Sequence, residues 1–424
     1  MPSKAAGRTL AEWLAYQETL HPHSIDLGLE RVRVVAERLA LLPPPGRTAI
    51  VGGTNGKGST AAMLAELAQA HGFRVGLFTS PHLSRYEERV CVDGAEVQDT
   101  ALCAAFTEIE AARGAETLTY FEFNTLAALL VFRAAEVDAT VLEVGLGGRL
   151  DATNLVDADV AVLCSVAMDH REWLGDTLEA IGTEKAGIFR AGKPVILGDS
   201  RMPDSVTQAL VALGCRPQIA GTHFAWRVRP DGRWDLHGAG LDYNALPPPA
   251  LEGAIQYRNA SVAVAALRAM IAPREPETQA IAAALRAVRL PGRLQFASGP
   301  VEWVFDVAHN EAAAAVLAAE LRSRPVRGRT IAVFAVLGDK DAAAVAAQLD
   351  AVVDHWLLCS LNGPRALPSD ELRQRMGTLR AASELAGDVS AAVARAGAIA
   401  RQGDRVVVCG SFHTVGPALK ARRL

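Results

Sequence analysis

A glycine-rich segment near the start of the chain has the residue types that bind phosphate. It reads Gly52-Gly53-Thr54-Asn55-Gly56-Lys57-Gly58-Ser59 and follows the β-branched, apolar run Thr48–Val51. Glycines let backbone N–H groups approach phosphate oxygens, and a helix beginning near Lys57 adds the partial positive charge of its N-terminus. Lys57 would neutralise the β- and γ-phosphates of a nucleotide, and the hydroxyl of Ser59 or Thr60 would face Mg²⁺. The spacing differs from the common G-x-x-x-x-G-K-[ST] pattern, and a glycine-rich turn with an unrelated lysine is the alternative.

Three further segments carry groups that suit metal or phosphate chemistry. Glu143 ends an apolar run and precedes glycines, and a carboxylate at a strand end suits a Mg²⁺ ligand. His170 also follows an apolar run, where an imidazole would complete a metal shell, although a histidine taken alone is more often a hydrogen-bonded core residue. The segment Gly182–Arg190 contains Lys185, and by itself it reads equally well as a solvated helix turn.

These groups need a sheet that brings strand ends together. Short apolar runs alternate with helical stretches, and this alternation predicts a parallel sheet covered by helices on both faces. Ligands gather at the carboxyl ends of such strands. The expected strands are Thr48–Val51, Arg74–Thr79, Ala139–Val144 and Val160–Val166, and the expected helices are Lys57–His71 and Asn124–Ala135.

The second half of the chain predicts a β-hairpin, two helices and a second, separate domain. Gly221–Leu246 mixes aromatic residues with charges and glycines, which indicates a β-hairpin excursion, and helices are expected over Asn259–Met270 and up to Val288. Leu290–Arg293 reads as a hinge because proline and glycine together stop the preceding helix. We expect an α/β fold: a P-loop nucleotide-binding domain with a mostly parallel sheet (residues 1–290), followed by a smaller Rossmann-like α/β domain (residues 291–424). The strands expected in the latter are Val301–Val307, Ile331–Val336, Val353–Cys359 and Arg405–Cys409.

Composition narrows the class of protein. The 424 residues are 50% hydrophobic and 21% charged, which is typical of a globular enzyme of two or three domains. The net charge of -4 gives no reason to expect nucleic-acid binding. Met1–Leu20 lacks the apolar core of a signal peptide, and the apolar run Leu126–Phe132 is far shorter than the about 20 residues that span a bilayer. Six scattered cysteines without a CxxC pair indicate a reduced cytosolic protein without a zinc site.

Taken together and in this order, the strings resemble the folylpolyglutamate synthases, in particular the bacterial bifunctional dihydrofolate synthase/folylpolyglutamate synthases of the Mur-ligase superfamily. The phosphate loop G-T-N-G-K-G-[ST] is a trait of that family and is matched in full. The resemblance covers essentially the whole chain and is specific as a set, whereas no single string would be. The matching segments are Ile25–Val32, Gly53–Ser59, Thr79–Leu83, Thr119–Glu122, Leu142–Asn154, Met168–His170, Glu184–Arg190, Leu290–Arg293, Phe305–Asn310 and Cys409–Val415.

The resemblance implies a nucleotide and metal site. Lys185 falls on the lysine that the family carbamylates, and CO₂ would turn this cation into an anion able to ligate a second Mg²⁺. Lys57, Lys185 and His170 would be catalytic, and His309 is a weaker candidate for a contact with ATP. ATP would contact Thr54, Asn55, Gly56, Lys57, Gly58, Ser59, Asn259, Arg293 and Asp306, and Mg²⁺ would be bound by Ser80, Glu143, His170 and Lys185.

The resemblance also implies a pteroate site. Phe121 would stack on the pterin or benzoyl ring, although a buried aromatic residue is equally ordinary core material. Asn124 departs from the glycine expected in close relatives, which bears on the shape of this pocket. Ser411 and His413 are candidates for the L-glutamate pocket. The residues implied to bind pteroate or folate are Ile25, Asp26, Leu27, Thr119, Tyr120, Phe121, Glu122, Leu150, Asp151 and Ala152.

The implied reaction is ATP-dependent ligation of L-glutamate to dihydropteroate and to reduced folates such as tetrahydrofolate, through an acyl-phosphate, by a cytoplasmic monomer. One alternative is a Mur ligase that acts on a peptidoglycan precursor, against which the segments Ile25–Arg31 and Thr119–Glu122 argue. Another is a P-loop module that binds ATP without ligation. Such a module would not need Lys185 or metal-binding residues at three strand ends.

Overall fold

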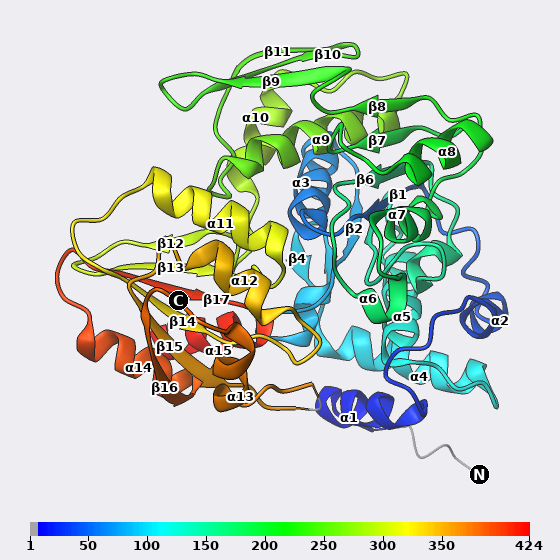
Figure 1. The fold of residues 1–424 in the computed structure, drawn as a ribbon. Coiled ribbons are helices and arrows are strands. Elements are labelled where there is room, and N and C mark those ends of the chain that lie inside the picture. Colours follow the sequence, from blue (N-terminus) through cyan, green and yellow to red (C-terminus); the bar gives the residue numbers. More distant parts are fainter. Residues whose placement is uncertain (1–6, 364) are drawn as a thin grey trace.

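The computed structural model describes residues 7–363 and 365–424. Residues 1–6, part of the N-terminal stretch without a signal-peptide core, lie outside them. Two sheets organise the chain, one in the blue-to-green part and one in the yellow-to-red part of Figure 1. The predicted α/β fold with a mostly parallel first sheet is confirmed. No helix in the described ranges has both the length and the apolar character needed to cross a bilayer.

The first sheet has eight strands in the order β4-β3-β2-β5-β1-β6-β7-β8. The strands from β2 to β8 in that order are parallel, and only the β2–β3 and β3–β4 pairs at one edge are antiparallel. The carboxyl ends of β2, β5, β1 and β6 therefore lie side by side. The strands are β1 (Arg47–Gly52), β2 (Val75–Phe78), β3 (Val90–Val92), β4 (Ala95–Glu96), β5 (Ala139–Glu143), β6 (Val160–Leu163), β7 (Val195–Leu197) and β8 (Pro217–Ile219).

Helices cover both faces of this sheet, as the alternation predicts. Alternate side chains of β1 enter different cores: Ile50 packs with the core of α1, α2, α4 and α5, whereas Ala49 and Val51 pack with α3, α9 and α10. The helices of this part are α1 (Leu10–Leu20), α2 (Glu30–Arg38), α3 (Lys57–Ala70), α4 (Asp99–Arg113), α5 (Tyr120–Ala134), α6 (Arg171–Leu174), α7 (Leu178–Ala186), α8 (Asp204–Ala212), α9 (Ile255–Ile271) and α10 (Thr278–Ala287), with short 3-10 turns η1 (Tyr86–Arg89) and η2 (Ala152–Leu155).

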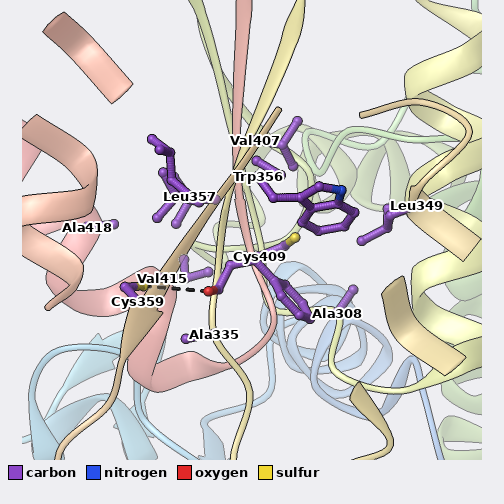
Figure 2. Packing of buried hydrophobic residues seen from close by; sticks show 14 of the residues in the cluster. Ala308, Ala335, Leu349, Trp356, Leu357, Cys359, Val407, Cys409, Val415 and Ala418 are labelled. Carbon is purple, nitrogen blue, oxygen red and sulfur yellow. Dashed lines mark hydrogen bonds between the residues drawn. The ribbon is translucent and has the colours of Figure 1, made fainter. Parts of the chain in front are cut away.

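The second sheet has six strands in the order β12-β13-β17-β14-β15-β16, parallel except for β12. Its core lies on both faces: Figure 2 shows Trp356 on the side of Leu349 and Leu357 on the side of Ala418. The predicted domain boundary at residue 290 falls between α10 and β12 and stays a prediction. The elements are β12 (Gln295–Ala297), β13 (Glu302–Asp306), α11 (Glu311–Ser323), β14 (Thr330–Phe334), α12 (Ala342–Leu349), β15 (His355–Ser360), α13 (Ser369–Met376), β16 (Ala382–Asp388), α14 (Val389–Ile399), β17 (Arg405–Cys409) and α15 (Phe412–Arg422).

Three predicted elements differ from the structure. The helix expected over Asn259–Met270 begins four residues earlier, at Ile255. The helix expected from Asn124 begins at Tyr120, because Thr119 and Glu122 form a capping box: the Glu122 carboxylate accepts from the Thr119 N–H at 2.7 Å, and the Glu122 N–H donates to the Thr119 hydroxyl at 3.3 Å. The predicted hairpin is one strand larger, an antiparallel sheet of β9 (Phe224–Val228), β10 (Trp234–Gly238) and β11 (Leu241–Leu246).

Candidate active site

Segment 52–59 forms a loop between β1 and α3, and hydrogen bonds to the segment after β6 fix this loop. The Thr54 N–H donates to the Ser165 carbonyl at 2.8 Å, and the Asn55 N–H donates to the Ser165 hydroxyl at 3.0 Å. Gly56 has a φ of 89°, which favours glycine, and the chain enters α3 at the next residue. The N–H groups of Thr54 and Asn55 thus fix the loop, and the N-terminus of α3 is the part of it that suits phosphate binding.

This loop opens on a cavity of about 420 Å³, which we call the loop cavity. Of the two hydroxyl residues proposed to face a metal, Ser59 lines this cavity, whereas Thr60 is buried with its hydroxyl 3.4 Å from Cys164 Sγ. Every residue implied to bind ATP or metal lines the same cavity: Thr54, Asn55, Gly56, Lys57, Gly58, Ser59, Ser80, Glu143, His170, Lys185, Asn259, Arg293 and Asp306.

Neighbouring strands place an acid beside the loop lysine. Glu143 ends β5, pairs in register with Val51 of β1, and is only 4% exposed. Its Oε2 accepts from the backbone N–H of Ser80, which follows β2, at 3.0 Å. Burial raises the pKa of the Glu143 carboxyl, and Lys57 is the largest influence that opposes the rise. A bound cation would stabilise the charged form of this carboxylate further.

Lys185 on α7 lies under the phosphate loop and not on a solvated turn, so that alternative is wrong for this residue. The side chain is buried, and its Nζ donates to the Gly53 carbonyl at 3.1 Å. Burial first, and then the Lys57 ammonium, lower the pKa of Lys185 to about 7. A substantial fraction of this amine is therefore neutral at neutral pH.

The segment after β6 meets the second sheet through Asp169. Its carboxylate accepts from Lys340 Nζ at 2.6 Å and from Asn310 Nδ2 at 3.0 Å. Asn310 also exchanges two amide hydrogen bonds of 3.0 Å with Asn55 of the phosphate loop. Burial lowers the pKa of His170 to about 3, so its ring is neutral, and its Nε2 lies 3.4 Å from Lys340 Nζ. Lys340 thus lies against Nε2, one of the two ring nitrogens through which this imidazole could bind metal.

Groups from α9 and the second sheet close the loop cavity. Asp306 at the end of β13 accepts from the N–H groups of Leu294 and Ala308, each at 2.8 Å, which fixes its carboxylate. Arg293 is half-buried, and its guanidinium lies over the ring of Phe412, 4.8 Å from the centroid. Burial lowers the pKa of Arg293, yet arginine remains charged at neutral pH.

A second cavity of about 300 Å³, which we call the aromatic cavity, adjoins the first. Phe121 lies against Gly145 so closely that a Cβ on that glycine would be 2.6 Å from the ring. Asn124 does not line this cavity; it is buried beneath it and accepts a hydrogen bond from the Tyr86 hydroxyl. All residues implied to bind pteroate line the aromatic cavity, as do Ser411 and His413: Ile25, Asp26, Leu27, Thr119, Tyr120, Phe121, Glu122, Leu150, Asp151 and Ala152.

The two cavities are adjacent, because seven residues line both of them and form a shared wall. The motifs of the sequence assign no role to Lys340 or Asn310. The sequence could have indicated a structural role for Asn310, because an asparagine before a helical run often caps the helix N-terminus. In the structure its Oδ1 accepts a hydrogen bond from the Ala313 N–H. No sequence pattern indicates a role for Lys340, because only the fold brings its loop to Asp169. The shared wall consists of Ser80, Pro81, Gly145, Leu146, His170, His309 and Phe412.

Comparison with known proteins identifies the family of the chain. The Mur ligase middle domain matches residues 51–215, and the Mur ligase, glutamate ligase domain matches residues 292–412. The dihydrofolate synthase/folylpolyglutamate synthase of Escherichia coli (strain K12) is 45% identical, covering 98% of this chain and 96% of the relative.

Solved structures agree over the full length. A structure of E. coli FolC in complex with DHPP and ADP has a TM-score of 0.93 and 44% identity, with 100% of both chains covered. A bifunctional folylpolyglutamate synthase/dihydrofolate synthase with Mn, AMPPNP and L-glutamate bound has a TM-score of 0.91 and 41% identity, again with 100% of both chains covered. The resemblance inferred from the motifs is thereby confirmed, and the chain belongs to the Mur ligase family and, within it, to the bifunctional dihydrofolate synthase/folylpolyglutamate synthases.

Proposed function

We propose that the chain ligates L-glutamate to 7,8-dihydropteroate, forming dihydrofolate, and to the γ-carboxylate of reduced folates, extending a polyglutamate tail. As a member of its family it is an ATP-dependent ligase of folate synthesis. The observation that carries the proposal is the shared wall of the two cavities. Because the cavities are adjacent, a carboxylate bound in the aromatic cavity would lie next to the terminal phosphate of a nucleotide bound in the loop cavity.

The first chemical step is attack of the acceptor carboxylate on the γ-phosphate of ATP, which gives an acyl-phosphate and ADP. Phosphoryl transfer depends on positioning and charge neutralisation more than on covalent help. Lys57 and Arg293 are the cations of the loop cavity suited to the developing negative charge. The amine of L-glutamate then attacks the acyl carbonyl, the amide forms, and phosphate leaves.

The residues around Glu143 fit a divalent cation. The carboxylate is buried and lacks an ion pair with a basic side chain in the described residues, and Ser80 lies beside it. His170 offers a neutral ring, although Lys340 lies against its Nε2. These residues would hold a Mg²⁺ ion, which would neutralise phosphate charge when bound.

Lys185 fits carbamylation, since CO₂ reacts with a neutral amine and the pKa of this buried lysine is about 7. Carbamylation would replace a cation by an anion and remove the repulsion between Lys185 and Lys57. The anion would serve as a ligand for a second Mg²⁺.

The aromatic cavity would hold the acceptor. Phe121 lines it and can stack on the flat pterin or benzoyl ring, while Asp151 is fixed by the N–H of Leu146 at 2.8 Å and that of Thr153 at 3.0 Å. Closure of the second sheet over the nucleotide would exclude water, which matters because acyl-phosphates hydrolyse readily. We further propose that the protein divides into domains at residue 290 and works as a monomer in the reducing cytoplasm, where its free thiols persist.

The test is phosphate release from ATP by the purified protein with L-glutamate and each of three acceptors. Dihydropteroate and tetrahydrofolate should each stimulate release and yield a glutamylated product by mass spectrometry. A nucleotide-linked muramyl acceptor should not. Stimulation by the muramyl acceptor alone would favour a peptidoglycan ligase, and ATP binding without release in any mixture would favour a non-ligating module.

A further inference from the structure

Arg89 is a buried cation of the aromatic cavity to which none of the motifs assigns a role. It ends η1, is 8% exposed, and lines the aromatic cavity without lining the loop cavity. Its Nε donates to His82 Nδ1 at 2.8 Å, and its guanidinium carbon lies 5.6 Å from the ring centroid of Tyr120 and 5.8 Å from that of Tyr86. Over residues 7–363 and 365–424 it forms no ion pair with an acidic side chain.

Burying a guanidinium in this way is costly unless an anion compensates. Arg405, which is buried to a similar extent, shows the usual solution: it pairs with Glu302 at 2.5 Å and donates to backbone carbonyls. The two terminal nitrogens of Arg89 donate no hydrogen bond within the described protein. Arg89 therefore has both terminal nitrogens free of protein partners among the described residues, in a side chain that lines a cavity.

The acid nearest in sequence is turned away from Arg89. Glu88 accepts from the backbone N–H groups of Leu83, Ser84 and Arg85 at 2.6, 2.8 and 2.7 Å, so its carboxylate caps the preceding turn. His82, which receives the Arg89 Nε–H, is neutral: burial first, and then Arg89 itself, lower its pKa to about 4. His82 and the rings of Tyr86 and Tyr120 hold the guanidinium in place, and none of these contacts is an ion pair.

We propose that Arg89 binds a carboxylate of a substrate in the aromatic cavity. The inference rests on the proposed function, which supplies carboxylate substrates. A guanidinium forms two parallel hydrogen bonds to a carboxylate, which adds orientation to charge. Three carboxylates fit this chemistry: the reacting group of the acceptor, the α-carboxylate of a glutamyl residue already on a folate, and a carboxylate of the incoming L-glutamate.

The test is steady-state kinetics of Arg89→Gln and Arg89→Lys with each substrate varied in turn. Loss of a charge-assisted pair should raise the KM for at least one carboxylate substrate by about tenfold or more, with the KM for ATP unchanged. Arg89→Lys should recover part of the loss, because it keeps the charge but not the paired donors. Arg85→Gln is the matched control, since Arg85 is exposed, pairs with Glu96 and lines neither cavity.

The pattern of KM values identifies the carboxylate. A rise for both dihydropteroate and tetrahydrofolate indicates the reacting group, a rise for tetrahydrofolate alone indicates the α-carboxylate of the existing glutamyl residue, and a rise for L-glutamate indicates the incoming amino acid. An unchanged KM for all three in both variants would overturn the proposal, as would an increase confined to ATP. If the wild-type enzyme showed no ligation activity, the proposed function itself would fail. ADP binding and the melting temperature of each variant would confirm that it is folded.

Discussion

The loop cavity and the aromatic cavity share a wall but are built in different ways. The loop cavity has Gly53, Glu143 and His170 at or after the carboxyl ends of adjacent parallel strands, and α7, α9 and the second sheet supply its other charged and polar groups. The aromatic cavity is assembled from the segment before α2, the first turn of α5, and loops of both sheets. The loop cavity is therefore centred on one edge of the first sheet, whereas the aromatic cavity depends on segments brought together from across the chain.

The largest effect should come from removing the cation of the loop cavity. Lys57→Ala should lower kcat by about 10³-fold with either acceptor, because the charge on the transferred phosphoryl group would lack its main partner. The rate of phosphate release with dihydropteroate and with tetrahydrofolate measures this fall in kcat. Binding of dihydropteroate, followed by pterin fluorescence, should be unchanged if the two cavities recognise their ligands separately.

Lys193→Ala is the matched control for Lys57→Ala, because Lys193 is exposed, pairs with Asp159 at 3.0 Å, and lines neither cavity. It should retain wild-type turnover. If Lys57→Ala kept activity with one acceptor only, a second nucleotide site would have to exist.

The next effect concerns Lys185, which lies behind the phosphate loop. Lys185→Ala should lower ligation by about 10²-fold, since the anion that carbamylation supplies would be missing. Added short carboxylates such as acetate or formate should restore part of the activity, and mass spectrometry of the wild-type protein should detect CO₂ on the lysine after trapping. Unchanged activity in Lys185→Ala would remove this residue from the mechanism.

The contrast between the cavities also explains what the sequence could predict. The groups of the loop cavity follow strand ends, so the apolar runs that lead to Gly53, Glu143 and His170 indicate a common edge from their pattern alone. The aromatic cavity has no such signal, because Ile25 and Phe121 lie far apart in sequence on segments of no special composition, and only the family resemblance brings them together. Lys340 was missed for the same reason.

A glycine at the shared wall allows the shape of the aromatic cavity to be changed directly. In Gly145→Ala the new Cβ would lie 2.6 Å from the ring of Phe121, so this ring, which lines the aromatic cavity, must shift. Overpacking of this kind costs about 1–3 kcal/mol, and we expect the acceptor KM to rise about tenfold while ADP affinity is unchanged. Gly397→Ala, in open space on α14, should change neither quantity. Equal losses for acceptor and ADP would show that the shared wall couples the two cavities.

The smallest effect should come from Phe121 itself, and it separates stacking from core packing. Phe121→Leu keeps an apolar side chain but removes the ring that lines the aromatic cavity and lies 5.7 Å from the Phe78 ring. An aromatic contact contributes about 0.5–1.5 kcal/mol beyond the area that it buries, so the KM for dihydropteroate should rise about threefold or somewhat more. Phe121→Tyr should restore most of this affinity because it keeps the ring. If instead the melting temperature fell while the acceptor KM stayed constant, Phe121 would be core material and the acceptor would be held by the polar groups of the cavity alone.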